Sequence, residues 1–264
     1  MEISQRNYLG LDFDGVIADS VLECLLSGLN AYAVLTGRGG RQISLVAIPA
    51  ETIAEMRRLR NYIRSGEDYV YIALAMDRGC VIRSQNDFDR FVKDNIHFKS
   101  AYYDQFYQER SELLKTNPEA WLNLNPLYPG MAKFLELIDD ENLFIVTTKE
   151  KLYVHKILSA NGIGLERKNV FRAVGKMNKH HIINKLMVDR KLNADQIIFV
   201  DDHVDTLKEV ASTGVECILA AWGYNTLEQR KEADDFGIMT YQLKEFLRLG
   251  ERFQIHGISE LKSS

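Results

Sequence analysis

Short apolar runs that end at turns alternate with segments of helical period along most of this chain. The runs cover 8–13, 143–148, 170–174, 197–200 and 216–220. Between them, apolar residues recur at three-to-four spacing in 130–141, 150–161, 177–191 and 204–213. Strands that alternate with helices favour a parallel sheet covered by helices on both faces. We therefore predict an α/β fold with a doubly wound parallel sheet.

The alternation breaks between the first run and the second. Residues 20–126 contain repeated helical patterns and little that is typical of a strand. Within this segment, the spacing predicts a helix over 51–65, between Pro49 and Gly66, and the aromatic-rich 92–114 should supply a local core. We predict an α/β core made of 1–19 and 127–250, an inserted helical cap domain over 20–126, and a flexible tail over 251–264.

The charge balance and the cysteines limit the environment and the partners. With 33 Lys and Arg against 37 Asp and Glu, the chain lacks the basic excess that phosphate-backbone binding requires, so nucleic acid is not an expected partner. Its three widely spaced cysteines indicate neither a disulfide framework nor a zinc site. No long uncharged apolar run occurs, so we expect a soluble cytoplasmic protein that does not enter a membrane. The oligomeric state is not indicated.

The first apolar run ends in two acids, in the segment LGLDFDGVIADS at 9–20. Asp12 and Asp14 lie two positions apart, and Gly15 follows at once. Carboxylates this close repel one another unless a cation or a proton lies between them. One interpretation is a pair of turn-forming aspartates, since Asp and Gly are common after strands. The other is a functional site.

A second acid cluster closes another run, in IIFVDDHVD, with Asp201, Asp202 and Asp205. A turn with a helix N-cap would also account for these residues. In an open parallel sheet, however, the carboxyl ends of the strands face one crevice where ligands bind. The acids of both motifs should then converge, and such a set of oxygen ligands suits Mg²⁺ better than zinc.

Hydroxyl and ammonium groups are expected at the same edge. The run 143–148 ends in Thr147 and Thr148, and Lys176 follows Gly175 close to the end of another run. Acids that hold a metal, together with a hydroxyl and a lysine, form a site suited to a phosphoryl group. Thr148 is accordingly a candidate for substrate binding.

Four motifs in order, DFDGVIADS, the FIVTT strand end, GK within VGKMNK and IIFVDD, resemble those of the haloacid dehalogenase-like hydrolases. The similarity is to the branch that includes phosphoglycolate phosphatases and β-phosphoglucomutases, in which a helical cap follows the first motif. The run LYPGM at 127–131 also resembles the return from such a cap. The resemblance implies a Rossmann-like core and Mg²⁺-dependent hydrolysis of a small phosphorylated metabolite.

The same resemblance implies a role for each core residue. Asp12 becomes the nucleophile that forms an aspartyl-phosphate. Asp14 becomes the general acid and then the general base. Thr147 would hold a phosphoryl oxygen, and Lys176 would neutralise the transferring group. Because Met177 stands where a proline is common in the family, Lys179 and Lys149 remain alternatives for the lysine role.

The metal ligands implied by the resemblance are Asp12, the backbone carbonyl of Asp14 and an acid of the IIFVDD motif. By position Asp202 matches the usual metal-binding aspartate, and Asp201 stands where a glycine is common. Counting four residues onward leads to Thr206 from Asp202 but to Asp205 from Asp201. Both Asp201 and Asp202 therefore stay candidates, with Asp202 favoured.

In the predicted cap, Arg57, Arg60 and Arg64 would lie along one helical stripe beside apolar residues. This pattern is typical of a solvated face. Alternatively, these arginines bind the non-reacting part of an anionic substrate, and 66–69 forms a specificity loop. Two further functions stay open: a sugar-phosphate mutase with the same core residues, and a non-catalytic binding module that retains a structural cation.

Overall fold

A computed structural model of the protein describes residues 8–38, 40–41 and 44–253. The chain divides into two compact units. The first, which we call the core unit, consists of Met1–Asp19 and Leu127–Ser264, and the second, the inserted unit, is Ser20–Pro126. Within the described residues, no helix combines the length and the apolar character that a membrane crossing requires.

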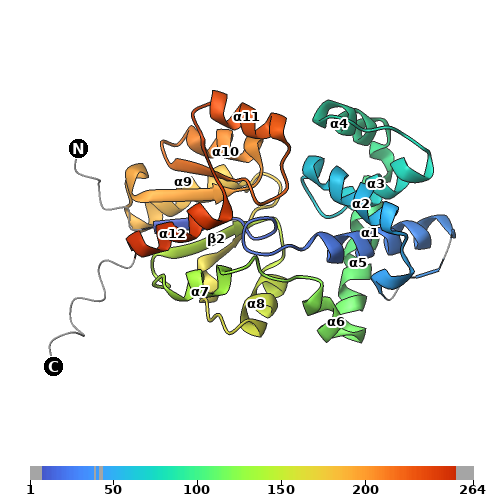
Figure 1. The fold of residues 1–264 in the computed structure, drawn as a ribbon, viewed down its shortest axis with the longest axis horizontal. Helices are drawn as coiled ribbons and strands as arrows, with labels where there is room; N and C mark the ends of the chain where they lie inside the picture. Colours follow the sequence, from blue (N-terminus) through green and yellow to red (C-terminus); the bar gives the residue numbers. More distant parts are fainter. Residues whose placement is uncertain (1–7, 39, 42–43, 254–264) are drawn as a thin grey trace. The chain divides into compact units, whose positions relative to one another are not determined.

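The core unit is built on a six-stranded sheet in which every pair of neighbouring strands is parallel (Figure 1). The strand order is β3-β2-β1-β4-β5-β6. The strands are β1 (Tyr8–Leu11), β2 (Leu143–Thr147), β3 (Val170–Arg172), β4 (Ile197–Asp201), β5 (Glu216–Ala220) and β6 (Met239–Tyr241). The predicted parallel sheet is confirmed, although β6 was not among the predicted strands.

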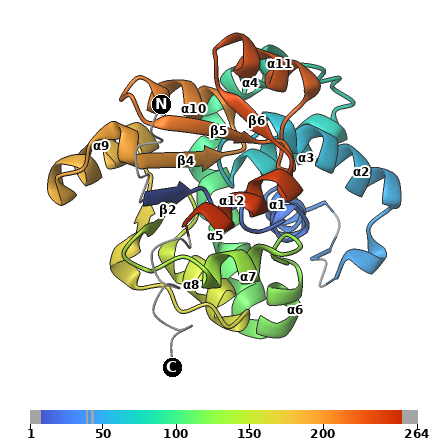
Figure 2. The same cartoon turned by 60° about the vertical axis from the view of Figure 1, so that its left-hand side comes forward.

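Helices cover both faces of this sheet, as doubly wound folds require. They are α7 (Met131–Glu136), α8 (Lys151–Ala160), α9 (Lys179–Arg190), α10 (Val204–Ala211), α11 (Leu227–Asp235) and α12 (Leu243–Phe253). In Figures 1 and 2, α9, α10 and α11 lie along one face, and α7 and α8 lie along the other. Under α9 and α10, Ile183 and Leu207 pack into one apolar cluster with Phe199 of β4.

The strand register places the ends of three neighbouring strands side by side. Leu11, the last residue of β1, pairs with Ile145 of β2 and with Val200 of β4. The residues that follow these three positions therefore lie at one edge of the sheet, at the point where the chain order reverses direction. Ligands bind at this place in open α/β sheets.

The inserted unit is helical among its described residues. Its helices are α1 (Val21–Thr36), α2 (Ala50–Leu59), α3 (Asp68–Asp77), α4 (Gln85–Asp94), α5 (Lys99–Thr116) and α6 (Pro118–Asn123). Helix α1 packs against α3 and α5. The predicted aromatic segment 92–114 divides between the end of α4 and α5.

The predicted helix over 51–65 is too long, because α2 ends at Leu59 and a 3₁₀ turn follows at Arg60–Tyr62. The reason lies in the next hydrogen bonds. The backbone N–H groups of Arg64 and Ser65 donate to the carboxylate of Asp68, at 2.9 and 3.1 Å, instead of to carbonyls of a preceding helical turn. At the other end of the chain, the expected tail over 251–264 begins inside α12, and 254–264 lies outside the described residues.

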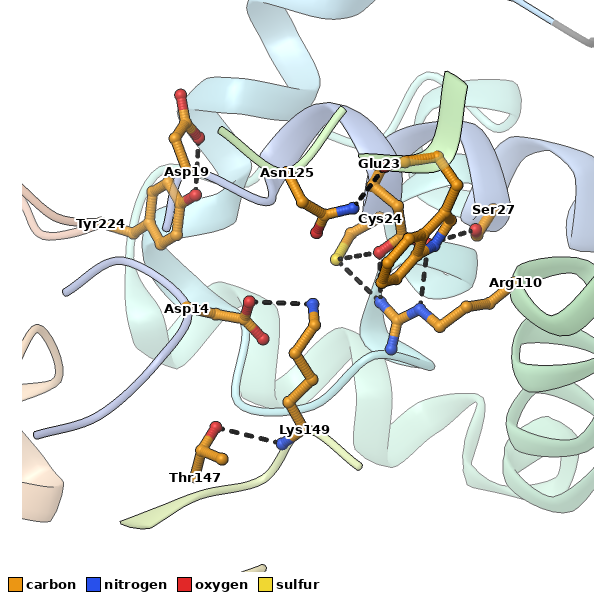
Figure 3. A network of polar contacts seen from close by, with 11 residues as sticks. Asp14, Asp19, Glu23, Cys24, Ser27, Arg110, Asn125, Thr147, Lys149 and Tyr224 are labelled. Atoms are coloured by element: carbon orange, nitrogen blue, oxygen red, sulfur yellow. Dashed lines mark hydrogen bonds and ion pairs between the residues drawn. The ribbon is translucent and has the colours of Figure 1, made fainter. Parts of the chain in front are cut away.

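A buried ion pair joins α1 to α5 inside the inserted unit (Figure 3). Two nitrogens of Arg110 lie 2.9 Å from the two carboxylate oxygens of Glu23, and Ser27 donates to the same carboxylate at 2.8 Å. Both partners are almost fully buried. Removing one partner of such a pair leaves an unpaired buried charge, which typically costs about 3–5 kcal/mol. No sequence pattern indicated this pair.

Asp68 should make the stability of the protein depend on pH. Burial raises the pKa of this carboxyl group from its ordinary value of 3.8 to about 6. The folded protein therefore favours the protonated form of Asp68. The stability that this preference provides is complete below pH 3.8 and is lost as the pH rises through 6, which lowers the free energy of unfolding by about 3 kcal/mol. In urea unfolding of the full chain between pH 4 and 8, Asp68→Asn should gain stability over the wild type as the pH rises.

A matched control is available in the same unit. The backbone N–H of Arg83 donates to Asp87 at 3.1 Å and lowers the pKa of that carboxyl group. Its contribution is complete above pH 3.8 and is lost only at lower pH, so between pH 4 and 8 the stability of Asp87→Asn should run nearly parallel to that of the wild type. Parallel pH profiles for Asp68→Asn and the wild type would contradict the role of Asp68.

Candidate active site

Three aspartates meet at the carboxyl edge of the sheet. Asp12 follows the end of β1, Asp201 is the last residue of β4, and Asp202 follows it. Each offers a carboxylate oxygen, these oxygens lie within 4.8 Å of one another, and all three residues are buried. Because β1 and β4 are neighbours in register, two motifs almost 190 residues apart in sequence reach one point. Such a cluster can hold a metal ion.

Lys179 brings a positive charge to this cluster. Its Nζ lies 2.8 Å from Oδ2 of Asp12 and 2.8 Å from Oδ2 of Asp201. Lys179 is the first residue of α9, whose N-terminus is fixed by the Asn178 side chain accepting from the His181 N–H at 2.9 Å. The helix start therefore directs this lysine at the acids.

Lys176, which the sequence analysis favoured for this role, is not at the acids. It is exposed in a turn next to Gly175, before α9 begins. The physical reason is the position at which α9 begins. Lys179 is its first residue and reaches the acids, whereas Lys176 lies in the turn before it. Lys179, which was an alternative, takes this place.

Burial and the neighbouring charges both shift the pKa values of Asp12 and Lys179. Burial raises the pKa of Asp12 to about 6, Lys179 opposes this shift, and the neighbouring Asp201 adds to it. Burial by itself would lower the pKa of Lys179, but Asp12 and Asp201 raise it above its ordinary value. Among the described residues, no group donates a hydrogen bond to the buried Oδ1 of Asp12. The cluster thus retains excess negative charge and a free oxygen ligand.

The turn that follows Asp14 packs tightly on Asp202. Gly15 has φ +90°, and a Cβ at this position would lie 2.1 Å from Oδ2 of Asp202, so only glycine fits. The same Oδ2 accepts a hydrogen bond from the Tyr224 N–H at 2.8 Å. Asp201 accepts from the His203 N–H at 3.0 Å. Both acids are thereby held in fixed orientations.

Asp14, the second acid of the first motif, pairs with a different lysine (Figure 3). Nζ of Lys149 lies 3.0 Å from Oδ1 of Asp14, and the Lys149 side chain is fully buried while Asp14 is partly exposed. The Lys149 N–H also donates to Oγ1 of Thr147 at 3.1 Å. The Thr147 hydroxyl accepts there, so its proton can be donated to a ligand. Thr148, its neighbour, is exposed.

The three arginine candidates belong to the inserted unit and do not share a helix. Arg57 is exposed on α2, Arg60 lies in the 3₁₀ turn and donates to the Ile63 carbonyl at 3.3 Å, and Arg64 follows that turn. Arg64 forms an ion pair with Asp89. The single stripe predicted for them is therefore wrong, because the helix that would carry it ends at Leu59. Their proposed contact with substrate stays a prediction.

One segment near the acids was missed from the sequence. The residues after β5 form the sequence AWGYN, at 221–225, and three of them, Trp222, Tyr224 and Asn225, donate hydrogen bonds to Asp202 or to the turn that follows Asp14. The signal that could have found them is the one used for the other motifs, since this segment also follows the carboxyl end of a strand.

Neither the protein-family models nor the curated protein sequences contain a match to this chain. Solved structures do match. A hydrolase of the haloacid dehalogenase-like family from Streptococcus pneumoniae is 13% identical, with a TM-score of 0.57 over 94% of this chain and 99% of that chain. A predicted phosphatase from Clostridium acetobutylicum is 14% identical, with a TM-score of 0.57 over 93% and 98%.

The structure of a predicted phosphoglycolate phosphatase from Haemophilus somnus also matches this chain. It is 16% identical, with a TM-score of 0.59 over 93% of this chain and 98% of that chain. The chain has the haloacid dehalogenase-like fold. The resemblance found in the four motifs is thus confirmed for the fold. The match covers nearly all of each chain, so it extends over the inserted unit as well as the core unit.

Proposed function

We propose that this protein is a Mg²⁺-dependent phosphatase that hydrolyses a small phosphomonoester through an aspartyl-phosphate on Asp12. The observation that carries the proposal is the buried cluster of Asp12, Asp201 and Asp202 in contact with Lys179 at the carboxyl edge of the sheet. Three carboxylates and one ammonium group suit a metal ion and a phosphoryl group bound side by side.

In the first step, a carboxylate oxygen of Asp12 attacks the phosphorus atom. The bond between phosphorus and the leaving oxygen breaks, its electron pair stays with that oxygen, and the leaving oxygen takes a proton from Asp14. In the second step, Asp14 removes a proton from water, and the resulting hydroxide attacks phosphorus. Inorganic phosphate leaves, and the Asp12 carboxylate is restored.

The other residues of the edge support these steps. Lys179 offsets the negative charge of Asp12 and of the phosphoryl oxygens that approach it. The hydroxyl of Thr147 donates to a phosphoryl oxygen, since its own oxygen already accepts from the Lys149 N–H. Lys149 holds the Asp14 carboxylate in one orientation through the 3.0 Å ion pair. In this assignment Lys179 has the role that the sequence analysis gave to Lys176.

The donor set fits a hard divalent cation. Carboxylate oxygens are the ligands that Mg²⁺ prefers, and the free buried Oδ1 of Asp12 offers one of them. Asp12, Asp202, Asp201 and the backbone carbonyl of Asp14 are the groups that would hold it. When bound, Mg²⁺ supplies charge stabilisation for the phosphoryl oxygens.

A small substrate is favoured by the haloacid dehalogenase-like fold with its helical insertion. A domain inserted next to the first motif can exclude water and select substrates by size. The similarity to a predicted phosphoglycolate phosphatase supports a test panel of small phosphorylated metabolites.

Phosphate release should require Mg²⁺ held by Asp202. We expect the wild type to release phosphate from an aryl phosphate and from at least one metabolite of the panel, to lose this activity on chelation, and to regain it with Mg²⁺. Asp202→Asn should weaken Mg²⁺ binding by about 10- to 100-fold, measured by calorimetry, because a charged ligand is lost.

Asp205→Asn is the matched control, since Asp205 is an exposed acid on the first turn of α10. It should bind Mg²⁺ as the wild type does. Phosphate release that survives complete chelation would contradict the metal dependence. Conversion of a sugar phosphate to its isomer without net phosphate release would indicate a mutase.

A further inference from the structure

The loop of residues 221–225, which joins β5 to α11, lies between Asp202 and the turn that follows Asp14. Trp222 Nε1 donates to the Val16 carbonyl at 3.0 Å. At Gly223, a Cβ would lie 2.4 Å from both Cβ of Asp202 and the carbonyl oxygen of Gly15. The loop therefore contacts both Asp202 and the turn that follows Asp14.

Tyr224 donates one hydrogen bond to Asp202 and one to Asp19, at the end of that turn. Its backbone N–H donates to Oδ2 of Asp202 at 2.8 Å, and its phenol donates to Oδ1 of Asp19 at 2.7 Å (Figure 3). Tyr224 is only 9% exposed. Asp19 is the last residue of the core unit before the insertion. A single buried residue thus connects a candidate metal ligand to the end of the turn that begins at Asp14.

The backbone of this loop is held by further hydrogen bonds that do not involve the Tyr224 phenol. The Asn225 side chain donates to the carbonyls of Asp202 at 3.1 Å and Ala220 at 2.9 Å. Arg230 donates to the Asn225 side chain and to the Ala221 carbonyl, both at 2.7 Å. These bonds hold the backbone of the loop whether or not the Tyr224 phenol is present.

The turn between Asp14 and Asp19 is closed by backbone bonds of its own, and the Tyr128 N–H also donates to the Ile17 carbonyl at 3.0 Å. The Gly15 N–H donates to the Ala18 carbonyl at 2.9 Å, and the N–H groups of Ile17 and Ala18 both donate to the Phe13 carbonyl at 2.9 Å. These bonds reach as far as Ala18, and beyond them the bond from Tyr224 holds the Asp19 side chain at the far end of the turn. Displacement of that end would displace Asp14, both its carboxylate and its backbone carbonyl.

We propose that Tyr224 is a positioning residue, whose phenol holds the Asp14–Asp19 turn in the geometry that the metal and the reacting groups need. The proposal rests on the proposed function for its catalytic readout. It concerns a residue that touches neither phosphorus nor metal and that acts through Asp19 and the turn.

The test compares four variants in the full chain: Tyr224→Phe, Asp19→Ala, Asp19→Asn and the double variant Tyr224→Phe with Asp19→Ala. Mg²⁺ affinity is measured by calorimetry, and kcat and KM with an aryl phosphate. Tyr224→Phe and Asp19→Ala should each weaken Mg²⁺ binding and lower kcat by about ten-fold, with KM little changed, as loss of outer hydrogen bonds to a metal site does. The backbone bond to Asp202 survives in each.

Two features separate positioning from simple stabilisation. Asp19→Asn keeps an oxygen that accepts from the phenol, so it should restore Mg²⁺ affinity and kcat to near wild-type values. The double variant should be no worse than either single variant, because both remove one bond. Tyr241→Phe removes an exposed hydroxyl at 3.8 Å from Met239 Sδ and should leave both quantities unchanged.

A lower melting temperature of Tyr224→Phe with wild-type Mg²⁺ affinity and kcat would overturn the proposal, as would a wild type that binds no Mg²⁺. Additive losses in the double variant would also overturn it. Should the wild type release no phosphate while the Mg²⁺ affinities still follow the expected pattern, the proposed function fails and the positioning role stands.

Discussion

Asp12→Asn should abolish phosphate release, to about 10⁻⁴ of the wild-type rate or below, because an amide cannot replace the carboxylate that forms the aspartyl-phosphate. Asp14→Asn should lower kcat for a metabolite by about 10²–10⁴-fold, since the leaving oxygen then lacks its proton donor. Both effects are measured as phosphate released from the best substrate of the panel at saturating Mg²⁺.

The covalent intermediate separates these two variants further. An aryl leaving group departs without a proton, so Asp14→Asn should still transfer the phosphoryl group to Asp12 but hydrolyse it slowly. Intact-protein mass spectrometry should then detect a phosphorylated Asp14→Asn protein and no such adduct on Asp12→Asn. An adduct on Asp12→Asn, or full activity of that variant, would contradict the assigned nucleophile. The exposed Asp205→Asn provides the control.

Lys179→Met should reduce kcat by about 10³-fold, whereas Lys176→Met should leave it near the wild-type value. Lys179 contacts both Asp12 and Asp201 at 2.8 Å, so its loss removes the ammonium group that offsets charge at the nucleophile. Without Mg²⁺, Lys179→Met should also be less stable by about 3 kcal/mol, because buried carboxylates lose their partner. Urea unfolding with and without Mg²⁺ measures this difference.

The pair of lysine variants tests the structure directly, because the two side chains lie only three residues apart in sequence. A large loss of activity in Lys176→Met together with an active Lys179→Met would contradict the assignment. Lys179→Arg keeps the charge with a different shape and should retain more activity than Lys179→Met. Circular dichroism shows whether each variant is folded.

Local patterns predicted the sheet and the place of the acids. Strand and helix periods are properties of short segments, and the parallel arrangement follows from their alternation. Because the carboxyl ends of parallel strands lie at one edge of the sheet, the strand directions alone predict that Asp12 and Asp201 lie close together. β6 escaped this reasoning because its three residues, Met239–Tyr241, are too few to display a period and are partly exposed.

Only the structure shows that Lys179, and not Lys176, lies at the acids, because this depends on where α9 begins. Asn178 caps that helix, and the first helical residue is then directed at the acids. In the same way, α2 ends at Leu59 because the Asp68 carboxylate, nine residues further along the chain, takes the N–H groups of Arg64 and Ser65. The helix propensity of residues 51–65 does not indicate that a side chain outside this segment takes these N–H groups.

Sequence periodicity and motif order alone were sufficient for the α/β core, the convergence of the acids and the family resemblance, because each depends on local pattern or on strand direction. The pairs Lys149 with Asp14, Glu23 with Arg110 and Tyr224 with Asp19 emerged only in three dimensions. These contacts join residues far apart in the chain, and they form only when strand register, turn geometry and helix packing are all set together.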